Sequence, residues 1–260
     1  MLYRELAPIS NDAWKEIDER ANEVLRTYLS ARKVVKVNGP KGLEFNAISE
    51  GRLGKTIEEG NACYANYNLI PLTETRIEFE MDRWELDNVE RGAADVDLGP
   101  MEEALRELAL LEDEAVFNGL KKAGIKGLKD YGEEPIPFGN TTKEIMDSVL
   151  SGVIKLRDNF IGGSYTLVVG EDTYKKILSE ESGYPLSKRL ESLIEGKILL
   201  SQVIEGAYLL PYNHEDLEFT IGKDYSIGYQ NHTAEKVRFF ATESFTFRVL
   251  DPNLVVRFTL

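Results

Sequence analysis

DRWELDNVERG, residues 82–92, is the densest acidic stretch of the chain. As chemistry, Glu85 and Glu90 are a candidate acid–base pair of the kind found in glycosidases. Such a pair needs one carboxyl that keeps its proton near neutral pH, whereas the flanking Arg83 and Arg91 favour ionised carboxylates. The same residues are typical of a connector or subunit interface in which carboxylates pair with arginines, and we favour that interpretation.

Trp84 is a large aromatic side chain within this polar stretch. Its indole offers a face on which a planar ligand can stack. Anchoring a contact between subunits is the commoner use of a tryptophan in such a setting. Both interpretations stay open at this point.

Upstream, the stretch Arg52–Asp82 differs from the rest of the chain in its residue pattern. Its first half is weakly patterned and interrupted by glycines. In its second half the uncharged residues Thr75, Ile77, Phe79 and Met81 alternate with charged ones. That alternation predicts a strand with one apolar and one charged face. We interpret the whole stretch as an extended two-stranded arm. Since an isolated ribbon is marginal in water, the arm is expected to pack on a neighbouring subunit.

The remaining chain predicts a mixture of helices and strands without a regular βαβ repeat, so the expected class is α+β. Expected helices cover Ser10–Tyr28, Pro100–Lys122 with Gly124 as its C-cap, a segment opened by the Thr141–Glu144 capping box, Asp172–Ser179 and Leu186–Ile194. Expected strands cover Lys33–Val37, the buried Tyr165–Val169, Ile198–Leu200, Ala207–Leu210, Phe219–Ile221, a half-buried Lys236–Arg248 and Leu254–Phe258.

Composition excludes several classes of protein. The chain has 260 residues, and 31 basic against 45 acidic residues give a net charge of −14. This excess repels phosphate backbones and argues against a nucleic-acid partner. Cys63 is alone, so no disulfide framework is expected. Met1–Glu5 lacks a signal-peptide pattern, and no run approaches the ~18 apolar residues of a membrane span. We expect a soluble, cytoplasmic protein without a membrane partner.

Residues that carry chemistry are scarce. The two histidines, His214 and His232, have no partner at metal-ligand spacing, and no phosphate-binding loop, HExxH or GxSxG motif is present. We therefore expect no enzyme, no catalytic residue and no metal site. The acidic, Gly- and Pro-bearing loop 180–185 reads as ordinary surface, or as the lining of a pore in a ring-shaped assembly.

Several segments match one family in its order and spacing, from residue 6 to about residue 250. They are Leu6–Ser10 with Trp14 and Arg20-Ala21; Trp84–Gly92, the most specific; Gly183–Leu186 with Lys188-Arg189; Asp224–Tyr229; and Thr242–Val249. On these residues the chain resembles the encapsulins of the family 1 type, formerly called linocin- or bacteriocin-like. Encapsulins are the shell proteins of bacterial and archaeal nanocompartments.

The resemblance implies the fold of a tailed-phage major capsid protein, with a peripheral domain, an axial domain and an extended loop. The implied division is 1–51 as N-terminal helix and part of the peripheral domain, 52–82 as extended loop, 83–136 as peripheral domain, 137–215 as axial domain and 216–260 as C-terminal peripheral strands. Closed icosahedral symmetry then requires about 60 or more copies. An arm that needs a partner and a chain without a catalytic centre both agree with a shell subunit.

The resemblance also implies cargo. Related shells enclose enzymes such as ferritin-like proteins or dye-decolourising peroxidases, whose C-terminal peptide docks in a groove on the inner wall, for iron storage or defence against oxidative stress. On this chain the implied groove residues are Leu25, Arg32, Tyr225, Ile227 and Tyr229.

Two further sites follow from the resemblance. No cofactor is required, but some related shells carry FMN or another flavin on the matching tryptophan, so Trp84 with Arg76 is the implied flavin site. The implied pore residues are Glu181, Ser182, Gly183, Tyr184 and Pro185, and five copies of Glu181 around an axis would favour cations such as iron.

Two alternatives to a compartment shell stay open. A phage or prophage capsid protein that packages DNA would share the fold, although the net charge of −14 disfavours it. A carboxylate-based hydrolase built on Glu85 and Glu90 is the less favoured one.

Overall fold

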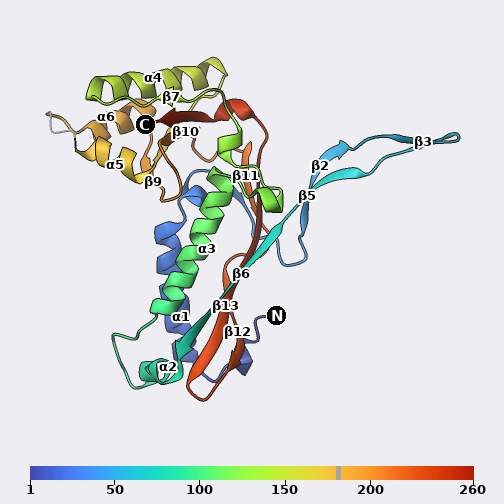
Figure 1. Ribbon diagram of the computed structural model, residues 1–260, viewed down its shortest axis with the longest axis vertical. Helices are drawn as coiled ribbons and strands as arrows, with labels where there is room; N and C mark the ends of the chain where they lie inside the picture. The colour runs from blue at the N-terminus through green and yellow to red at the C-terminus, as the bar shows by residue number, and fades with distance from the viewer. Residues whose placement is uncertain (180–182) are drawn as a thin grey trace.

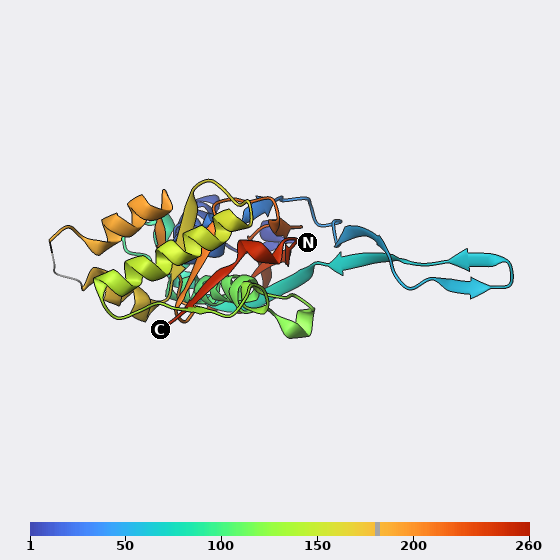
Figure 2. The same ribbon diagram turned by 90° about the horizontal axis from the view of Figure 1, so that it is seen from above.

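An upper lobe rich in helices, an elongated lower lobe and a thin arm make up the chain (Figure 1). This computed structural model describes residues 1–179 and 183–260. Seen from above, the arm leaves one side of the body as a long ribbon (Figure 2). Helices and both parallel and antiparallel strands are present, so the expected α+β class is confirmed.

The long strand β13 (Lys236–Val249) organises the lower lobe. One of its edges pairs with β6 (Thr73–Asp82), and its other edge pairs with β11 (Leu217–Ile221) and then β12 (Ser226–His232), all antiparallel. The short β1 (Lys36–Asn38) adds to β11 in parallel. Strand order in this sheet is β1-β11-β13-β12, so β12 is an edge strand.

One face of this sheet carries the lower core. Alternate residues of β6 and β13 meet apolar side chains of α1 (Asn11–Tyr28), α2 (Arg83–Glu90) and α3 (Gly99–Phe117). The rings of Trp14 and Phe239 meet edge-on with centroids 5.3 Å apart. These contacts fix α1 against the sheet and so determine the position of the groove between α1 and β12.

Local capping explains where the first helices begin. Ser10 accepts a hydrogen bond from the Ala13 N–H (3.1 Å), as its predicted N-cap role requires. The Asp82 carboxylate accepts from the N–H groups of Trp84 (2.8 Å) and Glu85 (3.2 Å). The acidic stretch 82–92 is therefore a capped helix, α2, which connects β6 to α3.

The predicted C-terminus of the second long helix was wrong. Helix α3 ends at Phe117, and Gly119, with φ of +85°, turns the chain by donating to the Glu114 carbonyl (3.0 Å). Gly119 packs closely on Gly127, and a Cβ atom at Gly127 would clash with the main-chain nitrogen of Gly119. Gly124 instead ends a separate turn, η3 (Lys121–Ala123).

The upper lobe holds a second sheet with a larger apolar core. Its strand order is β7-β14-β10-β8-β9, with bounds Ile136–Pro137, Val256–Thr259, Ala207–Pro211, Tyr165–Val169 and Ile198–Leu200. Its helices are α4 (Thr142–Asp158), α5 (Glu171–Leu178) and α6 (Leu186–Ile194). The Thr141–Glu144 capping box and the buried strand at 165–169 are confirmed. Strand β14, expected among the peripheral strands, lies here between β7 and β10 because its Val256 and Phe258 complete this core.

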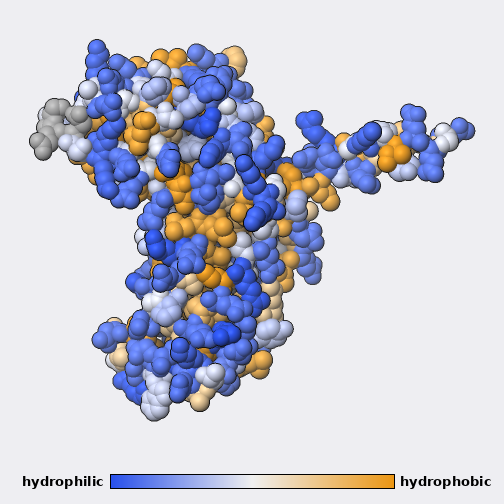
Figure 3. All heavy atoms as spheres, viewed as in Figure 1, coloured by the Kyte–Doolittle hydropathy of each residue, from blue (hydrophilic) through white to orange (hydrophobic). Residues whose placement is uncertain are grey.

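The arm is shorter than predicted and begins earlier. It consists of β2 (Ala47–Leu53) paired with β5 (Tyr67–Pro71), and β3 (Ile57–Glu59) paired with β4 (Ala62–Tyr64) at the tip. The stretch from Thr73 to Asp82 belongs to the body, since its apolar face packs in the lower core. We call 47–71 the arm. Apolar residues lie along it among hydrophilic ones (Figure 3).

Two strand predictions also need correction. Ala31–Lys33 is a 3-10 turn, η2, which buries Val34 and Val35 in the upper core, so β1 starts only at Lys36. Strand β13 is buried on both faces rather than one, because the Arg76 guanidinium covers the Phe240 ring at 3.6 Å on the outer face.

The short turns η1 (Arg4–Leu6), η4 (Leu128–Asp130) and η5 (Pro252–Leu254) complete the described elements. Within residues 1–179 and 183–260, no helix is long and apolar enough to cross a membrane.

Candidate functional site

A groove of about 660 Å³ runs between α1 and the start of β12. It is lined by Leu2, Arg4, Asp18, Ala21, Asn22, Leu25, Arg26, Leu29, Arg32, Lys33, Leu105, Asp224, Tyr225, Ser226 and Ile227. The predicted residues Leu25, Arg32, Tyr225 and Ile227 are among them, although they come from three separate parts of the chain. The structure therefore brings four of the five predicted groove residues together.

Tyr229, the fifth predicted residue, lies beyond the groove. Its side chain is nearly buried and its hydroxyl hydrogen-bonds His232 Nδ1 at 2.5 Å. Its main-chain N–H donates to the carbonyl of Leu2 (2.8 Å) at the outer edge of β12. Tyr229 is thus connected to the groove only through its main-chain N–H, which binds the groove-lining residue Leu2.

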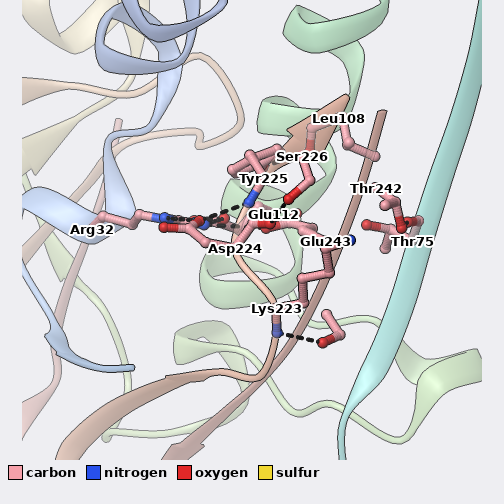
Figure 4. Close-up of polar contacts among 11 residues, drawn as sticks. Arg32, Thr75, Leu108, Glu112, Lys223, Asp224, Tyr225, Ser226, Thr242 and Glu243 are labelled. Carbon is pink, nitrogen blue, oxygen red and sulfur yellow. Dashed lines mark hydrogen bonds and ion pairs between the residues drawn. The ribbon is translucent and has the colours of Figure 1, made fainter. Parts of the chain in front are cut away.

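A charged cluster lies beneath the groove, and we call it the junction: Arg32, Glu112, Asp224, Tyr225 and Glu243. The Arg32 guanidinium donates to Glu112 (2.6–3.0 Å), Asp224 (2.8 Å) and Glu243 (3.1 Å). Figure 4 shows these side chains converging from η2, α3, β13 and the segment before β12. The junction ties the main elements of the lower lobe to the turn that follows α1.

The junction separates the lower and upper cores. Along β13, Val237, Phe239 and Ala241 face the lower core, and Phe245 and Phe247 face the upper core. Glu243 stands between them on the same face, with 1% of its surface exposed. A carboxylate at a position where the alternation calls for an apolar residue is the signal by which the sequence could have revealed the junction.

Carboxylates outnumber cations at the junction. Among the described residues, Arg32 is the only cation in ion-pair contact with the fully buried Glu112 or with Glu243. Burial raises the pKa of the Glu243 carboxyl well above its ordinary range, and the Glu112 carboxylate adds to that effect. Oε1 of Glu243 has no hydrogen-bond partner among those residues. Burial and the neighbouring Glu112 carboxylate thus both favour the protonated form of Glu243, whereas the Arg32 guanidinium favours its ionised form.

Asp113, next to Glu112 on α3, fastens the turn after α1. Its carboxylate accepts from the N–H groups of Ser30 (3.0 Å) and Ala31 (2.9 Å) and from the Ser30 hydroxyl. Burial raises its pKa to about 6, against the effect of these hydrogen bonds. The end of α1, and with it one wall of the groove, is positioned by this contact.

Trp84 and Arg76, the predicted flavin residues, lie apart within one subunit. The Trp84 ring is 67% exposed on α2, with the Arg91 guanidinium 5.4 Å from its centre. Arg76 lies on the outer face of β6 against Phe240, about 20 Å along the strand from Asp82, where α2 begins. One subunit therefore does not assemble a flavin site from this pair.

The predicted acid–base pair is not assembled either. The Glu85 carboxylate accepts from the Asp97 N–H (3.0 Å) and the Asn88 side-chain amide (3.0 Å), so it holds the loop that leaves α2. Glu90 follows five residues later on the same helix, on a different face. Over the described part of the chain, no cluster of three or more His, Cys, Asp or Glu residues is arranged to hold a metal ion.

The predicted pore residues lie in the connection between α5 and α6. Glu181 and Ser182 fall outside the described residues. Gly183 adopts a φ of +76°, Tyr184 is 67% exposed, and Pro185 immediately precedes α6. The two helices that it joins, α5 and α6, lie on the side of the upper lobe away from the arm (Figure 1).

Comparison with known proteins identifies the family. The family model described as "Encapsulating protein for peroxidase" matches residues 1–246. The chain belongs to the encapsulin shell protein family. It is 36% identical over 265 residues to the type 1 encapsulin shell protein of Rhodospirillum rubrum, covering 98% of this chain and 95% of that protein.

Solved structures agree on the fold. The subunit of a virus-like particle from Pyrococcus furiosus matches with a TM-score of 0.67 at 15% identity, covering 93% of this chain and 97% of that one. The capsid protein of Myoviridae phage XM1 matches with a TM-score of 0.58 at 13% identity, covering 87% and 90%. The predicted tailed-phage capsid fold is confirmed. As an encapsulin shell protein the chain is a structural subunit that assembles into a multi-copy shell, not an enzyme, which removes both alternatives to a compartment shell.

Proposed function

We propose that this encapsulin subunit captures a cargo enzyme by binding its C-terminal peptide in the groove between α1 and β12. The cargo class is a ferritin-like protein or a dye-decolourising peroxidase, and the compartment serves iron storage or defence against oxidative stress in the cytoplasm. The description of the matching family model, which names peroxidase, supports the second cargo class.

The observation that carries this proposal is the convergence of Leu25, Arg32, Tyr225 and Ile227 on one groove. Apolar Leu25 and Ile227 offer contacts for the alternate side chains of an extended peptide. The lining contains four cations (Arg4, Arg26, Arg32 and Lys33) and two carboxylates (Asp18 and Asp224), a balance that suits the terminal carboxylate of a cargo chain. Many weak sites on one wall then act together, so modest affinity at each suffices.

Substitution of Leu25 by glutamate tests the proposal. The shell is co-expressed with the ferritin-like protein and, separately, with the peroxidase of the source genome, and cargo per shell is measured after size exclusion. Leu25→Glu is expected to reduce loading at least tenfold while shells still form, since it puts a charge in the apolar part of the groove. Thr27→Glu, exposed on the same helix and outside the groove lining, is the matched control. Undiminished loading by Leu25→Glu would place cargo elsewhere.

We further propose that the connection between α5 and α6 lines a pore that admits cations such as iron. The exposure of Tyr184 and the position of α5 and α6 on the side of the upper lobe away from the arm support it. Glu181→Gln is expected to slow iron entry into assembled shells, measured by the rate of oxidation of added ferrous iron by the loaded cargo. An unchanged rate would assign iron entry to another opening.

For the flavin we propose a site that rests on Trp84 and not on Arg76 of the same subunit. The exposed indole offers a stacking surface for FMN or another flavin, and any further contact must come from a neighbouring subunit. Absorbance near 450 nm that co-elutes with the shell and disappears in Trp84→Ala supports the site. Colourless wild-type shells would refute it.

A further inference from the structure

The outer edge of β12 borders the groove and is almost unpaired. Among the described residues no strand pairs with this edge, and its one main-chain bond runs from the Tyr229 N–H to the Leu2 carbonyl (2.8 Å). In an antiparallel ladder, residues two apart direct their N–H and C=O groups to the same side. The main-chain groups of Ile227 therefore point toward the groove, which Ile227 lines.

Leu2, whose carbonyl accepts from the Tyr229 N–H, belongs to a segment, Met1–Leu6, that we call the strap. Its Leu2 and Arg4 are part of the groove lining. Arg4 fastens it by an ion pair with Asp18 (2.8 Å) and by lying over the Trp14 ring (3.9 Å). Through the Leu2 carbonyl, the strap thus already occupies one main-chain donor that an added strand would use.

The strap is held by few contacts. The side chains of Met1, Tyr3 and Leu6 are 48%, 55% and 61% exposed, and Tyr3 has a left-handed φ of 51°. Arg4 and Asp18 are themselves partly exposed, so their ion pair is a weak one. A segment with so little buried surface opens at low free-energy cost.

We propose that the outer edge of β12 binds an extended peptide by strand addition, and that the strap occupies part of this edge until a peptide takes its place. This inference rests on the proposed function of the groove and adds its binding mode. The main chain of the incoming peptide pairs with Ile227 and Tyr229, and its alternate side chains enter the groove. Because the strap must leave Tyr229, it lowers the apparent affinity for the peptide.

Hydrogen exchange on assembled shells tests the strap without any cargo. Arg4→Ala and Asp18→Asn both remove the ion pair that fastens the strap, but they change the charge of the groove in opposite directions. Arg4→Ala, which also loses the contact with the Trp14 ring, is expected to speed exchange of the Tyr229 amide by about tenfold, and Asp18→Asn, which loses the ion pair alone, by about threefold, because the strap then opens more often. Arg20→Ala, which removes an ion pair with Glu102 on another side of α1, is the control and leaves exchange unchanged. Unchanged exchange, or shifts in opposite directions, would overturn the release of the strap.

A defined probe tests strand addition. Green fluorescent protein ending in the nine residues MLYRELAPI, the sequence of residues 1–9, is co-expressed with the shell. Arg4→Ala shells are expected to enclose at least tenfold more of the tagged protein than of the untagged protein. Wild-type shells are expected to enclose less of the tagged protein than Arg4→Ala shells do. Equal enclosure of tagged and untagged protein in Arg4→Ala shells would refute the edge as a peptide site. Neither the hydrogen-exchange measurement nor this probe uses a natural cargo enzyme. A failure of either is therefore distinguishable from a failure of the Leu25→Glu experiment, which measures the loading of natural cargo.

Discussion

The junction and the arm place polar and apolar residues in opposite ways. At the junction, Glu112 and Glu243 are buried around Arg32, inside a body that otherwise buries apolar side chains. On the arm, Leu53, Tyr67 and Leu69 are 58%, 70% and 60% exposed. A single chain supplies the cation that pairs with the carboxylates of the junction, whereas the arm leaves its apolar surface without cover.

This difference separates what one subunit needs in order to fold from what many need in order to assemble. Buried charges are costly unless paired, so the junction is a condition for the fold of the body. Exposed apolar side chains on a ribbon contribute little to that fold and become useful when a second copy covers them. Substitutions in the two regions should therefore fail in different ways. Three substitutions test this, in the junction, beside it at Asp113 and on the arm, in order of their effect on subunit stability.

The largest effect is expected from Arg32→Leu. It leaves Glu112 and Glu243 buried without a cation, which costs about 3–5 kcal/mol for a buried pair broken from one side. For a chain of this size that corresponds to a fall in the thermal midpoint of about 10 °C. The measurement is thermal unfolding of purified shells, with Arg238→Leu as control, since its ion pair with Glu80 is exposed. Equal losses in the two variants would mean that the junction is not a special condition for folding.

The second effect depends on pH and concerns Asp113. Its folded pKa of about 6 lies above the ordinary value of 3.8, so its contribution to stability is full below about pH 4 and is lost as pH rises through 6. At 1.36 kcal/mol per pKa unit, that loss is about 3 kcal/mol. Asparagine does not titrate. When the pH is lowered from 7.5 to 4.5, the thermal midpoint of the wild type should therefore rise relative to that of Asp113→Asn. A difference between the proteins that stays constant with pH would contradict this.

Much of this fold could be predicted from local patterns. The helix capped by Ser10, the capping box at Thr141–Glu144 and the buried strand at 165–169 depend on neighbouring residues and were predicted well. The end of α3 was not, because it depends on Gly119 meeting Gly127. The split of 52–82 between arm and sheet depends on β13, which lies more than 150 residues further along the chain.

The candidate site divides in the same way. Leu25, Arg32, Tyr225 and Ile227 could be named from the family resemblance, and the structure brings them to one groove. The junction and the strap escaped prediction, since Glu112 looks like a solvent-facing charge in sequence, Glu243 is a single exception to the alternation of its strand, and Leu2 acts through its carbonyl. Local sequence patterns do not show which distant residues lie together in the folded chain, and both the junction and the strap depend on such contacts.

The smallest effect on subunit stability, and the clearest contrast with the junction, is expected from Leu69→Asp on the arm. Because the side chain is 60% exposed in the subunit, the thermal midpoint of the body should hardly change, as for other surface substitutions. Assembly should fail, since the aspartate would be buried unpaired where a second copy covers the arm. Light scattering after size exclusion would then show small species in place of a megadalton shell, while Asn66→Asp, exposed on the same ribbon, still assembles. Intact Leu69→Asp shells would mean that this side chain is not covered in the assembly, and a loss of the fold itself would mean that the arm belongs with the junction among the conditions for folding.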